Sequence, residues 1–270
     1  MHFEIATLAS QGARRAQEDI ALVWPPPIGI ASTTTAALPA GLEGHAVAVM
    51  CDGMGGHAGG SLASRLASEA FMLDVIADHA ETGDVRDRLF RALEISNAAL
   101  ADHIKDDPAV AGMGSTLVGV HLDDTGLHWI SVGDSLLFLW RAGHMLQLNA
   151  DHSLAPEIDK LAESGKITWE AAHNDPRRHY LRSALTGEEI EMIDLSEQAA
   201  LLEPGDVVIL ASDGIHTLDA DTICGIIGSS QQTSADAVAA ELIRTVDAAE
   251  QPHQDNTTVV AIRVCEQAAD

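Results

Sequence analysis

The segment AVAVMCDGMGGHAGG, residues Ala46 to Gly60, runs from an apolar stretch into one aspartate and then into glycines that surround one histidine. An apolar run followed by a turn-forming cluster is typical of a buried strand that ends near Asp52. Glycines have no side chains, so another backbone segment or a ligand can approach such a turn closely. Helical spacing begins shortly afterwards, at Leu62. The segment therefore predicts a buried strand, an open turn and a helix in succession.

Three glycine-rich motifs of known function do not fit this turn. Gly53, Gly55 and Ala58 satisfy the G-x-G-x-x-G/A spacing of dinucleotide-binding folds. The acid that such a fold requires would be Asp74, but this residue falls inside a helical pattern instead of ending a second strand. No lysine follows the glycines as in a P-loop, and no G-x-S-x-G nucleophile elbow is present. By itself, the glycine cluster is also compatible with an ordinary strand-to-helix turn.

Strand-like and helix-like patterns occur in blocks along the chain. Apolar or β-branched runs predict strands at residues 46–50, 116–121, 127–132, 136–140, 206–211 and 257–264. Amphipathic spacing predicts helices over residues 62–77, 85–99 and 235–246. The turns between residues 127 and 148 are too short for a crossover helix, so we expect these neighbouring strands to pair antiparallel. The blocks predict an α+β fold, an α/β sandwich of antiparallel sheets with helices on their outer faces.

Composition restricts the environment and the partners. The chain has 15 Lys and Arg against 41 Asp and Glu, a formal net charge of -26, which disfavours nucleic acid and anionic membranes and leaves carboxylates that can hold cations. The three cysteines, Cys51, Cys224 and Cys265, have no CxxC spacing and suggest neither a disulfide framework nor a structural zinc site. The first residues carry an acid, Glu4, where a signal peptide has its basic region, and nowhere do 18 apolar residues follow one another, so we expect neither a signal peptide nor a membrane span. We expect one globular, cytoplasmic domain over residues 1–270.

Two further segments have unusual composition. Residues 25–44 are rich in Pro, Thr and small residues, which predicts a surface insertion. Residues 151–187 carry Arg177, Arg178 and Arg182, a concentration of positive charge in a chain that is otherwise poor in it. These arginines are consistent with a solvated surface and also with docking of a phosphorylated partner.

Acidic residues stand at the edges of the apolar runs. They are Glu18, Asp19, Asp52, Asp134, Asp213 and Asp255. Each one alone is typical of a turn or a helix cap. If the strands lie side by side, however, these acids converge at one end of the sandwich, where they repel one another unless cations neutralise them. Oxygen ligands without Cys or His favour Mg²⁺ or Mn²⁺ over zinc.

Taken together, the motifs resemble those of the metal-dependent Ser/Thr protein phosphatases of type 2C, also called the PPM family. They cover nearly the whole chain in the family's order and read RRAQED, MCDGMGGHAGG, GMGSTLVG, VGDS, DHS, ASDGI and QDNTTVV. The resemblance implies two antiparallel sheets flanked by helices, with residues 151–187 as a flap beside the active site. It also implies hydrolysis of phosphoserine and phosphothreonine by a hydroxide that bridges two tightly bound Mn²⁺ or Mg²⁺ ions, in opposition to a Ser/Thr kinase.

The resemblance also implies roles for single residues in metal binding. Asp52 would bridge the two ions. Asp213 and Asp255 would complete the shell of the first ion, and Glu18 with the carbonyl group of Gly53 would serve the second.

Other roles implied by the resemblance concern positions around this pair. Asp19 would hold metal-bound water, and Asp134 with Asp213 would mark a third, weaker metal site. Arg14 occupies the position of the arginine that binds phosphate, so Arg14, Asp52 and Asp213 are the catalytic candidates. His57 is a candidate general acid, with a packing or capping role as its alternative.

Three positions depart from the family pattern. Gln17 stands where the family has Asn, Leu136 where an Arg follows the GDS sequence, and Met54 where animal members have His. None of the three is a predicted metal ligand. Two other functions remain open, a catalytically silent phosphoprotein-binding module of the same fold and a phosphomonoesterase for small molecules. We expect a monomer whose partners are phosphorylated proteins and their kinase, without nucleic acid or membrane.

Overall fold

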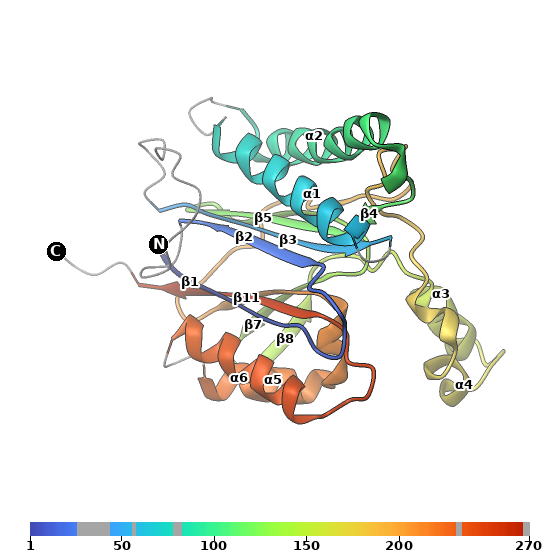
Figure 1. Ribbon diagram of the computed structural model, residues 1–270. Coiled ribbons are helices and arrows are strands. Elements are labelled where there is room, and N and C mark those ends of the chain that lie inside the picture. Colours follow the sequence, from blue (N-terminus) through green and yellow to red (C-terminus); the bar gives the residue numbers. More distant parts are fainter. Residues whose placement is uncertain (26–43, 56–57, 78–82, 231–233, 267–270) are drawn as a thin grey trace.

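The computed structural model describes residues 1–25, 44–55, 58–77, 83–230 and 234–266. Two β-sheets pack face to face, and helices cover the outer face of each (Figure 1). The predicted insertion at residues 25–44 lies almost entirely outside the described residues, and His57 lies outside them as well. Among the helices of the described part of the chain, none combines the length and apolar composition needed to cross a lipid bilayer.

The first sheet has five strands, and every neighbouring pair is antiparallel. In spatial order they are β1 (His2–Ser10), β11 (Thr257–Cys265), β10 (Val207–Ala211), β7 (Leu136–Arg141) and β8 (His144–Gln147). The outer face of this sheet packs against α5 (Ala220–Ser230) and α6 (Ala235–Ala248).

The second sheet is also antiparallel. Its strands in spatial order are β2 (Asp19–Trp24), β3 (Ala46–Met54), β5 (Leu117–Asp123), β6 (Gly126–Val132) and β9 (Asp194–Leu195), and the short β4 (Gly114–Ser115) pairs with β3. The outer face of this sheet packs against α1 (Ala58–Ala77) and α2 (Val85–Asp106). The helices predicted within residues 62–77, 85–99 and 235–246 are therefore confirmed as α1, α2 and α6.

Alternation along β3 explains why this strand is apolar at successive positions. Val47 and Val49 face the helical layer, whereas Ala48 and Met50 face the other sheet. Both sides of the strand are buried, so both sets of side chains are apolar. The strand ends at the cavity described below, and it carries Asp52 out of the core to that position.

The predicted pairing of the strands at residues 127–132 and 136–140 is wrong. β6 belongs to the second sheet and β7 to the first, so residues 133–135 cross from one sheet to the other. Gly133 has a φ of +104°, and a Cβ there would lie 2.6 Å from Cγ2 of Thr116, so a glycine is required at the crossing. The predicted antiparallel pairing of β7 with β8 is confirmed. The crossing carries Asp134.

The segment predicted as a flap forms short helices that project from one side of the sandwich (Figure 1). They are α3 (Ala155–Glu163), α4 (Trp169–His173) and the 3-10 turn η3 (Pro176–His179). A small apolar core of Ile158, Ala162 and Ala172 holds them together. Two more 3-10 turns complete the described elements, η2 (Pro108–Val110) and η4 (Asp213–Thr217).

Candidate metal centre

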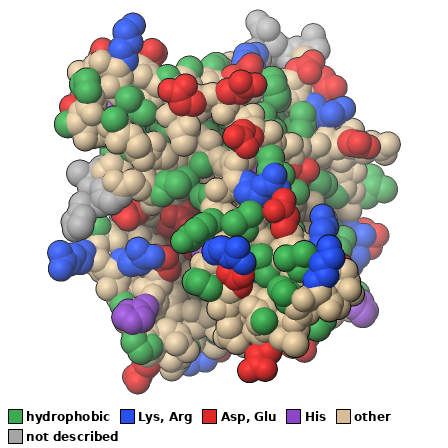
Figure 2. Space-filling model, turned by 90° about the vertical axis from the view of Figure 1, so that its right-hand side faces the viewer, with side chains coloured by type: hydrophobic (Ala, Val, Ile, Leu, Met, Phe, Trp, Pro, Cys, Tyr) green, Lys and Arg blue, Asp and Glu red, His purple; other side chains and the backbone are tan. Residues whose placement is uncertain are grey.

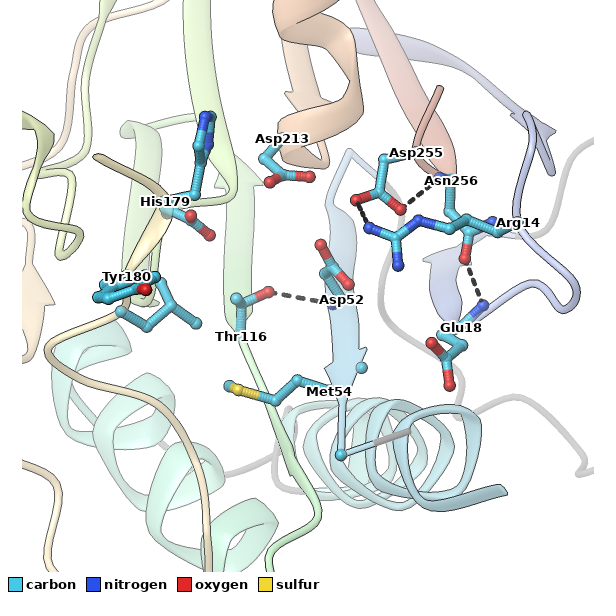
Figure 3. A pocket seen from close by; sticks show the side chains of 14 residues that line it. Arg14, Glu18, Asp52, Met54, Thr116, His179, Tyr180, Asp213, Asp255 and Asn256 are labelled. Atoms are coloured by element: carbon cyan, nitrogen blue, oxygen red, sulfur yellow. Dashed lines mark hydrogen bonds and ion pairs between the residues drawn. The ribbon is translucent and has the colours of Figure 1, made fainter. Parts of the chain in front are cut away.

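A cavity of about 640 Å³ lies on the side of the molecule that carries the flap. Carboxylates from both sheets line it, and Figure 3 shows those of Asp52, Asp213 and Asp255 pointing into the same space. The predicted ligands that line the cavity are Glu18, Asp52, Gly53, Asp134, Asp213 and Asp255. The predicted convergence of strand-end acids is therefore what the structure shows.

Asp52 and Asp19 face each other across two paired strands. The register of β2 and β3 places Asp19 directly opposite Asp52. The backbone of Asp52 is fixed by Thr116, whose Oγ1 accepts from the Asp52 N–H at 3.0 Å and whose N–H donates to the Asp52 carbonyl at 2.9 Å. Asp19 is only 4% exposed, and the hydroxyl of Ser212, which directly follows β10 of the other sheet, donates to its Oδ2 at 2.7 Å. Asp19 therefore links the two sheets beneath the cavity.

Asp213 and Asp255 lie on two loops of the first sheet that pack closely against each other. Asp213 begins η4 directly after β10, and Asp255 precedes β11. The side-chain amide of Gln254 donates to the carbonyl group of Gly214 at 3.1 Å. A Cβ on Gly214 would lie 2.1 Å from the carbonyl oxygen of Asn256, so only glycine permits this approach.

Asn256 anchors the loop that carries Glu18. Its Oδ1 accepts from the Glu18 N–H at 2.8 Å (Figure 3). Its Nδ2 donates to the carbonyl groups of Gln11 at 2.9 Å and Ala16 at 3.0 Å. Three backbone groups of one loop therefore depend on this one buried side chain. The sequence motif QDNTTVV contains Asn256, but the sequence alone assigned it no role.

The glycines of the opening segment make room for Glu18. A Cβ on Gly60 would lie 2.6 Å from Oε1 of Glu18, and a Cβ on Gly53 would lie 2.0 Å from the carbonyl oxygen of Gly60. Any side chain at either position would displace the carboxylate or the backbone beside it. Glycine is therefore required at positions 53 and 60 by the packing around Glu18, which an ordinary turn would not need.

Burial and mutual repulsion raise the pKa values of Asp52, Asp134 and Asp213. Burial is the main cause for Asp52, whose pKa lies well above its usual value, and the charges of Asp19 and Asp213 add to the rise. Burial and the charge of Asp213 raise the pKa of Asp134 to about 7. Burial and the charge of Asp255 raise the pKa of Asp213 to about 6. A cation bound among these groups would therefore displace protons.

The oxygen atoms of the cluster fit divalent cations. Three buried carboxylate oxygens have no hydrogen-bond partner among the described residues: Glu18 Oε1, Asp19 Oδ1 and Asp213 Oδ1. Leaving such oxygens without a partner is costly, and a cation among them would remove that cost. Because every donor is an oxygen, Mg²⁺ or Mn²⁺ suits the site better than a metal that prefers nitrogen or sulfur.

Arg14 lies at the rim of the cavity and forms an ion pair with Asp255 (Figure 3). Its neighbour Arg15 is exposed and does not line the cavity. His179 and Tyr180, at the end of the flap, also form part of the wall. Sequence reasoning missed these two residues, because no motif marks them and only the fold of the flap brings them to the cavity.

The flap arginines do not line the cavity. Each is paired with a carboxylate of the flap itself: Arg177 with Asp175, Arg178 with Asp159 and Arg182 with Glu157. On the face that Figure 2 presents, Lys and Arg side chains are interspersed with Asp and Glu and form no uniform positive patch. These pairs leave the flap with less available positive charge than its sequence suggests.

Comparisons with known proteins agree with this geometry. The family model described as Protein phosphatase 2C matches residues 38–259. The serine/threonine protein phosphatase PstP of Mycobacterium tuberculosis is 34% identical over 172 residues, which are 64% of this chain and 32% of that protein. The match thus spans about a third of the length of this relative.

Solved structures match over nearly the whole chain. The crystal structure of the Mycobacterium tuberculosis serine/threonine phosphatase PstP/Ppp has a TM-score of 0.76 at 28% identity and covers 98% of this chain and 99% of that one. A structure of the PstP catalytic domain in complex with two manganese ions has a TM-score of 0.74 at 28% identity, with coverage of 98% and 99%. The likeness confirms the sandwich predicted from the sequence.

Proposed function

The chain belongs to the protein phosphatase 2C family, and we propose that residues 1–270 act as one metal-dependent catalytic domain that hydrolyses phosphoserine and phosphothreonine in proteins. The observation that supports this most strongly is the cluster of buried carboxylates, contributed by both sheets, around one cavity that Arg14 borders. A binding module without catalysis would have no need to maintain this mutual repulsion.

We assign the metal ligands from the donor atoms that face the cavity. Asp52, Asp213 and Asp255 would hold one Mn²⁺ or Mg²⁺ ion, and Asp52 with Glu18 and the carbonyl group of Gly53 would hold a second. Two such ions, when bound, generate a nucleophile from water and neutralise the phosphoryl oxygens.

The other residues of the site position these ligands. Thr116 fixes the backbone of Asp52, and Asn256 fixes that of Glu18. Both carboxylates therefore project from a backbone that is held in place. We infer that Asp19, held by Ser212 and opposite Asp52 in the strand register, would accept a hydrogen bond from a water beside Asp52. His57 stays a prediction as general acid, because it lies outside the described residues. Within the flap, His179 is better placed to contact a substrate than the arginines are.

Arg14→Ala should weaken binding of the substrate and of inorganic phosphate by about 10- to 100-fold, or ~1.5–3 kcal/mol, because a planar guanidinium donates two charge-assisted hydrogen bonds to phosphate. Affinity for Mn²⁺ should not fall, since Asp255 loses a cation that competes for its carboxylate. Inhibition by phosphate and calorimetric titration with Mn²⁺ measure the two effects. Arg15→Ala is the matched control, and equal losses in both variants would indicate a general charge effect.

Asp134→Ala should spare the two tightly bound ions but lower turnover severalfold and shift its dependence on Mn²⁺. Asp134 lies in the crossing between the sheets and faces the cavity beside Asp213, where we propose a third and weaker ion. Leu136, which departs from the family pattern, is buried in the apolar layer under α5 and α6 and anchors the crossing by packing. Loss of the tight ions in this variant would place Asp134 in the primary shell, and unchanged turnover would remove the third site from the mechanism.

The substrate class is tested by comparing rates on a phosphothreonine peptide and on a small phosphate ester, each with and without Mn²⁺. A protein phosphatase should show a much higher kcat/KM on the peptide and require Mn²⁺ for both substrates. A small-molecule phosphomonoesterase would favour the ester. A silent binding module would bind the peptide without releasing phosphate. We propose that the physiological substrates are targets of a Ser/Thr kinase that this enzyme opposes.

A further inference from the structure

Two histidines and one aspartate come together at the end of β3 that lies away from the catalytic cavity. His45 directly precedes β3, and the β3–β5 register pairs Val47 with His121, which brings His45 opposite Asp123. Each of His45, His121 and Asp123 offers one ligand atom, and these atoms all lie within 4.8 Å of one another. The two imidazole rings are 5.4 Å apart between centroids.

The three side chains share the side of the sheet that α1 and α2 cover. Residues two apart on a strand point to the same face, so His121 and Asp123 lie on the face that Leu117 presents to the helices. His121 is 1% exposed and Asp123 is 7% exposed, whereas His45 is only half-buried. The group is therefore an interior cluster with one member that an ion could reach from solvent.

We propose that His45, His121 and Asp123 bind one Zn²⁺ ion, with water as the fourth ligand. Two imidazole nitrogens and one carboxylate oxygen are a ligand set that zinc commonly takes. Ligands of a tetrahedral zinc ion at about 2.1 Å lie roughly 3.4 Å apart. His121 Nδ1 and Asp123 Oδ2 are 3.6 Å apart, close to that spacing.

Thr125 orients the carboxylate of this site. Its N–H donates to Asp123 Oδ1 at 2.7 Å, and its hydroxyl donates to the same oxygen, which leaves Oδ2 directed at His121. His128 faces His121 across β5 and β6, but its Nε2 lies 3.4 Å from Thr125 Oγ1, and it is not one of the three residues whose ligand atoms converge. His128 is therefore a matched neighbour outside the ligand set.

The zinc site is separate from the catalytic cavity. His45 and Asp52 are seven residues apart along an extended strand, which is roughly 23 Å at about 3.3 Å per residue. Zinc bound here would tie the start of β3 to the end of β5. It would therefore stabilise the strand that delivers Asp52 to the cavity, without contact with substrate.

Equilibrium dialysis of the full chain against Zn²⁺, in excess Mg²⁺, tests the proposal by stoichiometry. His45→Gln and Asp123→Asn should each bind one equivalent fewer than the wild type, whatever number of ions the catalytic site takes. His128→Gln should bind the same number as the wild type. Because His45 is half-buried, His45→Gln should remain folded, which its circular dichroism spectrum checks.

Cobalt identifies the ligands independently. Co²⁺ in a tetrahedral site with nitrogen ligands absorbs visible light far more strongly than Co²⁺ surrounded by six oxygens, so the catalytic site contributes little to this signal. The strong absorption should be present in the wild type and in His128→Gln and absent from His45→Gln and Asp123→Asn. Equal stoichiometry and equal cobalt spectra in all four proteins would overturn the proposal.

Discussion

Asp52→Asn should lower turnover of a phosphorylated peptide by about 1,000-fold or more, because the residue proposed to bridge both ions would lose its charge. The substitution should remove the charge of Asp52 without moving its side chain. Thr116 holds the Asp52 backbone from both sides, so an asparagine of the same shape should occupy the same place. The measurement is phosphate release at saturating Mn²⁺, with Mn²⁺ affinity followed by calorimetry. Wild-type turnover in this variant would rule out the proposed mechanism.

The same substitution should stabilise the protein when no metal is present. Burial and the neighbouring acids raise the pKa of Asp52, which means that its charged form opposes folding. Asparagine removes that charge, so the melting temperature in metal-free buffer should rise by several degrees. Asp102→Asn, on an exposed position of α2, is the control and should change neither activity nor melting temperature. A lower melting temperature for metal-free Asp52→Asn would mean that the charge of Asp52 does not destabilise the folded protein.

The metal-free protein should lose stability as pH rises from about 4 to about 7. In the folded chain the pKa is raised from 3.8 to about 6 for Asp213 and to about 7 for Asp134. An acid whose pKa is higher in the folded state binds more protons there, so its contribution is greatest below the unfolded pKa and is lost as pH passes the folded value. A carboxyl that titrates near pH 7 instead of near 3.8 costs the folded state about 4 kcal/mol at high pH.

Mn²⁺ should restore the stability that is lost at higher pH, because the bound ions neutralise the charged carboxylates of the site. The difference in melting temperature between Mn²⁺-saturated and metal-free protein should therefore grow from about pH 4 to about pH 7. Taking the difference cancels groups outside the site, such as His128, His152 and His216, whose pKa values burial lowers. A difference that stays constant across this range would contradict the raised pKa values.

The acids of the site could be found from the sequence because strand-end positions are local features. Asp52, Asp213 and Asp255 each border an apolar run, and antiparallel strands bring such ends together. The strand pairing around Gly133 could not be found in this way. A short turn is equally compatible with a hairpin and with a crossing between stacked sheets, and only the packing of Thr116 against Gly133 distinguishes the two.

Other parts of the site depend on contacts between residues that are distant in sequence. Asn256 holds backbone groups of Gln11 and Ala16, some 240 positions away, so its own neighbourhood in the chain gives no sign of the role. For the flap, the sequence suggested a feature that the structure does not have. Its arginines suggested a positive docking surface, but carboxylates of the same segment neutralise them, as Arg178 and Asp159 illustrate. The edge strands β1 and β2 were missed, although residues 20–24 of β2 form an apolar run. Most residues of both strands are only partly buried or exposed, as at the edge of a sheet.

Phosphate release from a phosphothreonine peptide, followed while Mn²⁺ is added to metal-free protein, tests the proposed metal-dependent catalysis most directly. We expect no release without metal, activity that appears as the two tight sites fill and rises further as the weaker third site fills, and no comparable activity in Asp52→Asn at any Mn²⁺ concentration. Release by metal-free protein at the rate of the Mn²⁺-saturated enzyme would contradict the assignment of this carboxylate cluster as a catalytic metal centre.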